Sequence, residues 1–223
     1  NNWGGIDHKV LEFHEYVNLF SGKSGSGKST VMDAIQVILY GSFSPSFLNK
    51  AADDAKNRRS VLSYLRGEQK DGSANRKDCD FCSVIALEIE DTGTHIITCI
   101  GIAFEVRKSD SEIKKFVYFS HSGKMPESEY LTEQGVCYSN QEIKKLVSAR
   151  TKSDDNRGKG EVNRIYGSKE AYLGTLYDVI LGYIDQNRFI TMEKSAIALK
   201  MTNGTGQFIR DYMFPKNTSN TIA

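Results

Sequence analysis

The chain has 223 residues, of which 39% are hydrophobic, so it is long enough to bury a core as one large domain or two small ones. The 29 lysines and arginines nearly balance 28 aspartates and glutamates, and this formal net charge of +1 excludes a whole-protein field that attracts nucleic acid. No apolar run approaches the ~20 residues of a membrane span, and the first residues lack a signal peptide pattern, so we expect a cytoplasmic protein without membrane contact.

Two short strands are predicted near the N-terminus, at residues 9–13 and 16–20, and the second leads directly into a glycine-rich stretch. Over residues 28–40 the apolar side chains recur at helical spacing, and Gly41 stands where a C-cap glycine is expected. The predicted local order is therefore strand, loop and helix.

The glycine-rich stretch matches a phosphate-binding loop, because Gly22-x-x-x-x-Gly27-Lys28-Ser29 is a full Walker A pattern. The glycines let successive N–H groups converge on phosphate oxygens, and the helix start adds a positive dipole end. We expect the Lys28 ammonium to reach the β and γ phosphates of ATP and the Ser29 hydroxyl to ligate Mg²⁺. The predicted ATP-binding residues are Gly22, Lys23, Ser24, Gly25, Ser26, Gly27, Lys28, Ser29 and Thr30.

The middle of the chain predicts an antiparallel meander over residues 80–122. A polar connector at 42–60 and a short amphipathic stretch at 60–67 come before it. Apolar residues then alternate along three runs joined by short turns, which favours sequential antiparallel strands. In the second run Cys99, Gly101 and Ala103 keep one face small, so a second layer is expected to approach closely there.

The last third of the sequence predicts mostly helices. Ser139 and Glu142 form a capping box that opens a helix to about Arg150. Residues 151–167 are charged and predict a mobile surface loop, and a second helix is predicted over 168–183. A final strand is expected at 195–201 and a helical turn at 207–214.

Hydrolysis of ATP also needs an acid at the end of an apolar strand to hold magnesium. The best candidates are residues 88–91, but the alternation there and the turn that follows favour the solvent edge of a hairpin. Asp185 ends a helical pattern instead of a strand. The sequence thus lacks a clear second half of a catalytic site.

The four cysteines are too few for a disulfide framework and indicate reduced thiols. Cys79 and Cys82 form a lone Cys-x-x-Cys pair, and the absence of a second closely spaced pair argues against zinc. A zinc site would need two more ligands from Cys99, His95, Cys137 and His121.

The stretch GSGKSTVMDAIQVILYG resembles the start of SMC-type and ABC-type chromosome and repair ATPases, with Asp33, Ala34 and Ile35 matching the continuation of their Walker A helix. Ser24 stands where common SMC heads have asparagine, and RRSVLSYLRG and FIRDYMFP resemble segments of MukB-like and Wadjet JetC-like proteins. In these families the N-terminal lobe holds Walker A, and a C-terminal lobe beyond a long coiled coil brings the signature and Walker B motifs.

The resemblance implies an α/β P-loop NTPase fold, the N-terminal lobe of an ABC/SMC-type head with an antiparallel β-meander and flanking helices. It implies one lobe over residues 1–223, with a Walker A subregion at 1–67, the meander at 80–122 and a helical subregion at 139–215 leading towards a coiled coil. Such a lobe dimerises around ATP and Mg²⁺, hydrolyses ATP only in a composite site, and helps extrude circular DNA for cleavage.

The partners implied by the resemblance are the C-terminal lobe of the same protein, a second head, kleisin-like and accessory subunits, a nuclease and double-stranded DNA. The family's catalytic and magnesium-placing Q-loop glutamine would be Gln207, with Gln186 as a competitor. The family's arginine near ATP would be Arg59 or Arg58, with Arg66 a weaker choice.

Three other functions stay open on the sequence: another SMC-like ATPase of DNA repair, a self-contained P-loop kinase, which needs parallel strands around the loop, and a nucleotide-binding regulatory module without turnover. Local basic clusters occur at 56–59 and at 144–159 and allow phosphate contact. Because Asp154 and Asp155 dilute the second cluster, a solvated face is favoured there.

Overall fold

The computed structural model describes residues 1–23, 25–45, 48, 59–69, 71–153 and 162–197. The chain divides into two compact units, Asn1–Ile184 and Asp185–Ala223, and each is described by itself. The single lobe expected over residues 1–223 stays a prediction.

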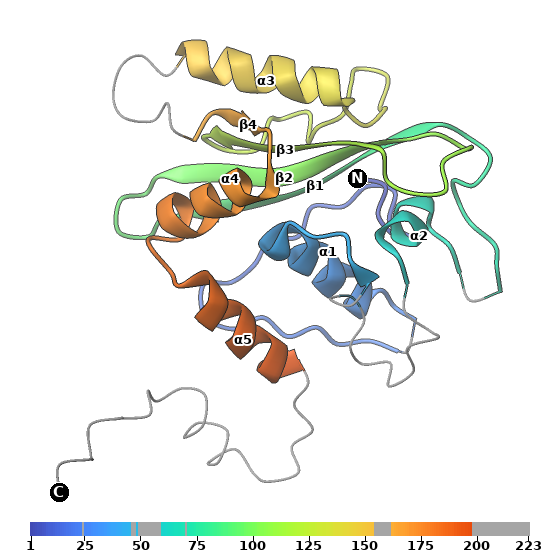
Figure 1. The fold of residues 1–223 in the computed structure, drawn as a ribbon, viewed down its shortest axis with the longest axis horizontal. Coiled ribbons are helices and arrows are strands. Elements are labelled where there is room, and N and C mark those ends of the chain that lie inside the picture. Colours follow the sequence, from blue (N-terminus) through green and yellow to red (C-terminus); the bar gives the residue numbers. More distant parts are fainter. Residues whose placement is uncertain (24, 46–47, 49–58, 70, 154–161, 198–223) are drawn as a thin grey trace, which may run out of the picture. The chain divides into compact units, whose positions relative to one another are not determined.

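The first unit is built on a four-stranded sheet with the order β1-β2-β3-β4 (Figure 1). The strands are β1 Phe81–Glu90, β2 Ile97–Val106, β3 Lys115–Ser122 and β4 Arg164–Tyr166. Every pair is antiparallel, with Ile85 opposite Ile102 and Ile102 opposite Tyr118. The predicted antiparallel meander is therefore confirmed.

The short strand β4 lies inside the predicted surface loop and was not expected. It pairs with the edge strand β3, where Tyr118 lies opposite Tyr166. The Ser120 hydroxyl contacts the Tyr166 hydroxyl at 2.6 Å and donates to the Val162 carbonyl. Three residues are too few to show an alternating pattern, so this pairing is set by contacts distant in sequence.

Helix α3 Asn140–Ser153 covers one face of the sheet, opposite the face that carries α1 (Figure 1). Its capping box forms as predicted: the Ser139 N–H donates to Glu142 Oε2 at 2.6 Å, and the Glu142 N–H donates to Ser139 Oγ at 3.3 Å. The buried side chains of this layer are Val84, Ala103, Phe119, Tyr130, Cys137, Ile143 and Val147. The close approach expected at the small face of β2 is confirmed at Ala103.

The helices on the other face are α1 Lys28–Tyr40, α4 Lys169–Gly174 and the π-helix η4 Thr175–Ile180, while the short helix α2 Val61–Arg66 follows the connector. Helix α1 has the predicted bounds, and Gly41 closes it in the left-handed conformation at φ 53°. The predicted helix over 168–183 forms in two parts, because the chain changes from α to π geometry at Thr175.

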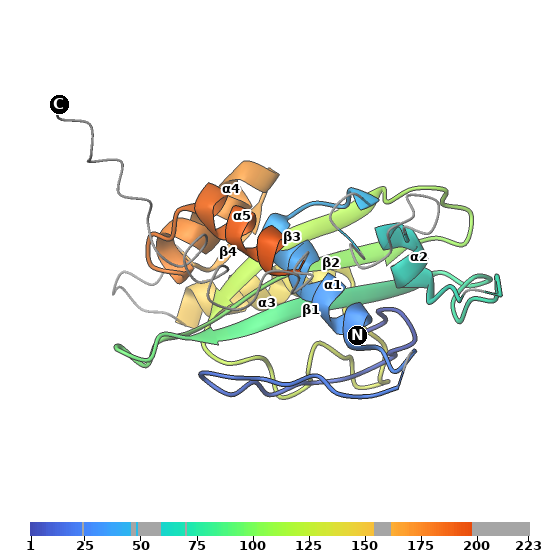
Figure 2. The ribbon, with the colours of Figure 1, turned by 90° about the horizontal axis from the view of Figure 1, so that it is seen from below.

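The strands predicted at residues 9–13 and 16–20 are wrong, because neither segment is a strand. Figure 2 shows this segment, in blue, as two extended arms outside the sheet. Its apolar side chains face solvent: Tyr16 is 87%, Val17 79% and Leu19 89% exposed. A β-prone sequence needs a neighbouring strand to pair with, and the described chain supplies none to this segment.

The described part of the second unit is helix α5 Gln186–Ile197. The Asp185 carboxylate accepts the Arg188 N–H at 2.8 Å, as an N-cap does. The strand predicted over 195–201 is wrong for 195–197, which continue the helix once it is capped. Residues 198–201 and the turn at 207–214 lie outside the described residues.

Within the described ranges, none of the helices combines the length and the apolar character that crossing a lipid bilayer requires.

Candidate nucleotide site

The glycine-rich loop forms a tight bend ahead of α1. Gly25 and Gly27 have φ values of 84° and 89°, a region that favours glycine. At Gly22 an added Cβ would lie 2.6 Å from the Ser26 Oγ atom, so a side chain there would displace Ser26. The Ser26 N–H donates to the Lys23 carbonyl at 3.2 Å and closes the bend. The Walker A glycines are therefore required by backbone geometry and close packing.

The Lys28 ammonium lies over the loop that precedes it. It donates to the Gly22 carbonyl at 2.7 Å, the Lys23 carbonyl at 3.0 Å and the Ser26 hydroxyl at 3.3 Å. The Lys28 charge is thus held against the bend, where converging phosphates are expected. Binding a phosphate exchanges these neutral acceptors for anionic oxygens, which form stronger bonds to an ammonium group.

The first turn of α1 suits an anion. It contains no acidic residue and no side-chain cap, so its N–H groups and positive dipole end face the loop without a competing carboxylate. The glycine bend, the ammonium and this helix end fit a triphosphate. Lys28 and the loop N–H groups would hold the phosphates of ATP, and a bound Mg²⁺ would neutralise their charge during phosphoryl transfer.

Ser29 and Thr30 have different surroundings. Ser29 is exposed next to Lys28 and its hydroxyl is accessible to a magnesium ion. The Thr30 carbonyl accepts the Trp3 indole N–H at 2.8 Å, and the Thr30 methyl occupies the space beside Gly4. Thr30 therefore fixes the start of α1 against the N-terminal segment.

A second group of side chains holds the middle of α1. The Tyr64 hydroxyl donates to the buried Asp33 carboxylate, and the Tyr64 ring stacks on Trp3 at 5.0 Å. Burial, followed by the bond to Asp33, raises the pKa of Tyr64 well above its usual value. Arg59, the arginine expected near ATP, lies over the Tyr64 ring with its guanidinium carbon 5.4 Å from the ring centre. The structure thus places Arg59 against the Tyr64 ring, which is bound to Asp33 of α1.

Three tyrosine hydroxyls bind the far end of α1, a feature that the sequence analysis missed. Tyr172 donates to the Ile38 carbonyl at 3.0 Å, Tyr177 to Leu39 at 2.9 Å and Tyr118 to Gly41 at 2.6 Å. We name Tyr118, Tyr172 and Tyr177 the tyrosine anchor. They satisfy carbonyls that a helix C-terminus leaves unpaired. Burial raises the pKa of Tyr118 and of Tyr177 to about 12, so both hydroxyls keep their protons.

The sequence offered only a partial signal for this anchor. Helical spacing places Tyr172 and Tyr177 on the inward side of one helix, but it does not show which partner they meet. The Tyr118 and Tyr172 rings stack at 4.6 Å, and this contact spans two elements distant in sequence.

The acidic residues considered for magnesium are engaged elsewhere. The Glu88 carboxylate accepts the Met125 N–H at 2.7 Å, and Glu90 contacts His95 at 3.0 Å. The Asp91 carboxylate accepts the N–H groups of the following turn at 2.8 and 2.9 Å. Bonds to the Thr94 and Gly93 N–H groups hold the Asp91 pKa below its usual value. The hairpin interpretation of residues 88–91 is confirmed.

The remaining candidates are placed as follows. Arg66 donates to the carbonyls of Asp110 at 2.5 Å and Lys108 at 3.1 Å, so it holds the loop after β2. Gln186 begins α5. Gln207, Ser24 and Arg58 lie outside the described residues.

The cysteines are free thiols, exposed at Cys79 and buried at Cys99 and Cys137. Burial raises the pKa of Cys82 to about 11, which disfavours the thiolate that a metal would bind. Among the described residues no group of three or more histidine, cysteine or acidic side chains is placed to hold a metal ion.

The comparison with protein families gives the same assignment to this region. Residues 1–55 match the family described as the P-loop containing region of AAA domain. The first quarter of the chain is a P-loop region. No curated protein matches the chain. The match over residues 1–55 and the loop geometry together support a P-loop NTPase with an α/β fold, a nucleotide-binding protein of the general ATPase type.

Proposed function

We propose that the chain is the ATP-binding lobe of an SMC-like head of the MukB-like and Wadjet JetC-like kind. In this proposal the lobe binds ATP and Mg²⁺ but hydrolyses ATP only after a complementary lobe completes the site and two heads meet around the nucleotide. The assembled protein works on double-stranded DNA in defence against plasmids, with kleisin-like subunits and a nuclease as partners.

The observation that carries this proposal is the contrast between a fitted phosphate loop and a catalytic site that is incomplete among the described residues. Lys28, the glycine bend and the start of α1 fit ATP, whereas Glu88 is bound to the Met125 N–H and Asp91 to the turn after β1. The acid that holds magnesium is therefore expected from another polypeptide segment. A composite head requires this arrangement, in which one lobe holds the phosphate loop and another lobe completes the catalytic site.

The exposed segment before the loop supports the same interpretation. Its apolar side chains are Val10, Leu11, Phe13, Tyr16, Val17, Leu19 and Phe20, all exposed beyond a third. Such a patch on one stretch of chain indicates an interaction site. We infer that a strand from the complementary lobe pairs with this segment and buries it, which would also fix the start of the phosphate loop.

A self-contained kinase is less well supported. Such an enzyme surrounds its phosphate loop with parallel strands, but every strand pair in the described chain is antiparallel. The isolated chain is therefore expected to show no transfer of phosphate to an acceptor.

Phosphate release measured with and without the complementary lobe tests the proposal. The chain alone should release almost no phosphate, and addition of a lobe carrying the signature and Walker B motifs should give turnover. The Lys28→Ala variant in the same mixture is the control and should stay inactive. Robust turnover by the chain alone, or phosphorylation of an acceptor, would contradict the composite site.

A further inference from the structure

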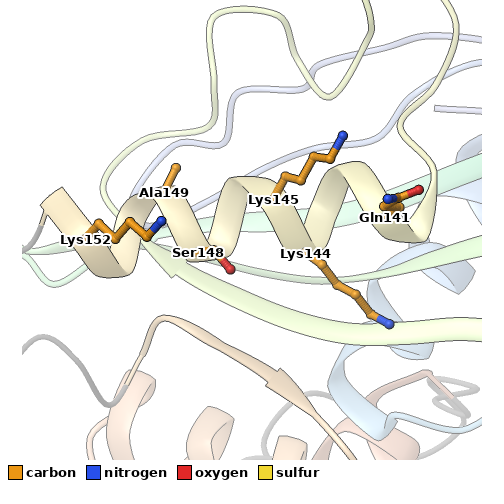
Figure 3. A pocket seen from close by; sticks show the side chains of 6 residues that line it. All are labelled: Gln141, Lys144, Lys145, Ser148, Ala149 and Lys152. Atoms are coloured by element: carbon orange, nitrogen blue, oxygen red, sulfur yellow. The ribbon is translucent and has the colours of Figure 1, made fainter.

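The solvent side of α3 carries a row of lysines around two small residues. We call it the lysine face; its residues are Gln141, Lys144, Lys145, Ser148, Ala149 and Lys152, which line a shallow hollow (Figure 3). The helical repeat puts these residues on one side, while Ile143 and Val147 are buried on the other. The sheet thus fixes the orientation of the lysine face.

The positive charge of this face is not neutralised within the described chain. Lys144, Lys145 and Lys152 are exposed and form no ion pair with a described residue. Glu142, the acidic residue of α3, is bound to the Ser139 N–H in the capping box. Arg150 differs from the lysines, because it donates to the Lys124 carbonyl at 3.2 Å. Among the described residues, the exposed side of α3 is therefore positive, although the chain is nearly neutral.

The shape of the lysine face suits a rod-like polyanion. Lys144 and Lys145 extend to opposite sides of the helix axis in Figure 3, and Lys152 lies at the far end. Between them Ser148 and Ala149 are short, so a ligand can approach the helix backbone closely. Lys144 and Lys152 are two full turns apart, about 12 Å along the axis, a length that covers roughly three to four phosphates of one DNA strand.

The composition of the face selects among polyanions. Protein interfaces centre on aromatic and other large apolar anchors and are depleted in lysine, whereas this face contains no aromatic residue. Single strands need aromatic platforms for base stacking, which are also absent from it. Lysine, serine and glutamine are side chains that contact the phosphates of a duplex.

We propose that the lysine face docks the sugar-phosphate backbone of double-stranded DNA without reading its sequence. This inference rests on the proposed function, in which the lobe works on DNA. Its chemical basis is the row of exposed lysines on α3. Each lysine that contacts a phosphate releases counterions, so the affinity depends steeply on salt.

The test is fluorescence anisotropy of a labelled DNA duplex with the whole chain, without nucleotide, over a salt series. Replacing Lys144, Lys145 and Lys152 by alanine should weaken binding and reduce the slope of log affinity against log salt by about 2.7, since each phosphate contact contributes about 0.9. Alanine favours helix, so α3 should stay folded, which circular dichroism checks. The corresponding triple arginine variant keeps the charge and should keep the slope.

A matched control replaces the exposed lysines Lys9, Lys77 and Lys108 by alanine; like the α3 lysines they form no ion pair with a described residue, and the change removes the same charge elsewhere. The control should keep the native slope. The proposal is overturned if the native chain does not bind the duplex, if the α3 variant keeps the native slope, if the control loses as much, or if the single strand binds more tightly. Binding of an ATP analogue, measured on the same samples, separates a failure of the nucleotide site from a failure of this surface.

Discussion

The two ends of helix α1 are held in opposite ways. At its start, the leading segment exposes its apolar side chains, and the contacts of Lys28 are to its own loop. At its end, three buried tyrosines from β3, α4 and η4 donate to the last carbonyls of the helix and to that of its C-cap glycine. One helix thus joins a firmly packed rear end to a phosphate loop whose leading segment is exposed.

The rear of α1 is packed within the described chain alone. The segment that leads into the front of α1 is left exposed for a partner to cover. The rear end has its core side chains and its hydrogen bonds in place. The front end has a phosphate loop of the right shape, but the strand-like sequence before it has no strand to pair with. The predictions below test this difference, beginning with the largest effect.

Matched leucine truncations should differ most between the two ends. Leu176 is fully buried at the rear, and Leu176→Ala is expected to lower the free energy of unfolding by about 3 kcal/mol through lost burial and a cavity. Leu19 at the front is 89% exposed, so Leu19→Ala should change it by less than about 0.5 kcal/mol. Urea unfolding of both variants measures these changes. Equal losses of unfolding free energy would contradict the difference in packing between the two ends.

Lys28→Ala should strongly weaken ATP binding at the front of α1 without unfolding the chain. Loss of a charged bond to phosphate is expected to cost about 2–3 kcal/mol, roughly a hundredfold in affinity for ATP. Lys23→Ala is the control, because its part in the bend is played by a main-chain carbonyl. Titration with a fluorescent ATP analogue measures both, and a native affinity in the Lys28 variant would rule out the assigned role.

Tyr172→Phe should lower the free energy of unfolding by about 1–2 kcal/mol, because it leaves the buried Ile38 carbonyl without its donor. Tyr16→Phe removes a hydroxyl from a side chain at the front that is 87% exposed. It should not measurably change the free energy of unfolding. Thermal unfolding of the two variants checks this. An unchanged Tyr172→Phe variant would show that the tyrosine anchor does not stabilise α1.

Acid should destabilise the packed sheet through His121, which is fully buried. Its Nδ1 faces the Ser122 carbonyl at 3.0 Å and carries the proton, so Nε2 accepts the Tyr130 hydroxyl at 2.9 Å. Burial lowers the pKa of His121 below its usual 6.5, so the unfolded chain takes up the proton first as the pH falls. The free energy of unfolding should therefore decrease below about pH 6.5.

Urea unfolding at pH 7.5 and at pH 5 measures this effect, which we expect to be the smallest of the four. His121→Gln should reduce the pH dependence, whereas His14→Asn, at an exposed front position, should keep it. If the His121 variant kept the full dependence, other groups would be responsible.

The parts of the fold that sequence predicts are those with a strong local pattern. The bounds of α1, the capping box at Ser139 and the three long strands follow from periodicity and cap chemistry. The strand β4 and the change to π geometry at Thr175 do not, because both depend on contacts with β3 and α1.

The same distinction applies to the site. The Walker A pattern fixes which residues bend the loop and where Lys28 lies. The leading strands were predicted from composition alone, and they fail because pairing needs a neighbour that local sequence cannot supply. The local sequence does not show the partners of the tyrosine anchor for the same reason.

The central claim is that the loop ahead of α1, with Lys28, binds a triphosphate. Calorimetric titration of the chain with a slowly hydrolysed ATP analogue and magnesium, repeated with the complementary lobe present, tests it most directly. We predict a heat of association that disappears in the Lys28→Ala variant and persists in the Lys23→Ala variant. Absence of any heat, even with the complementary lobe, would contradict the account.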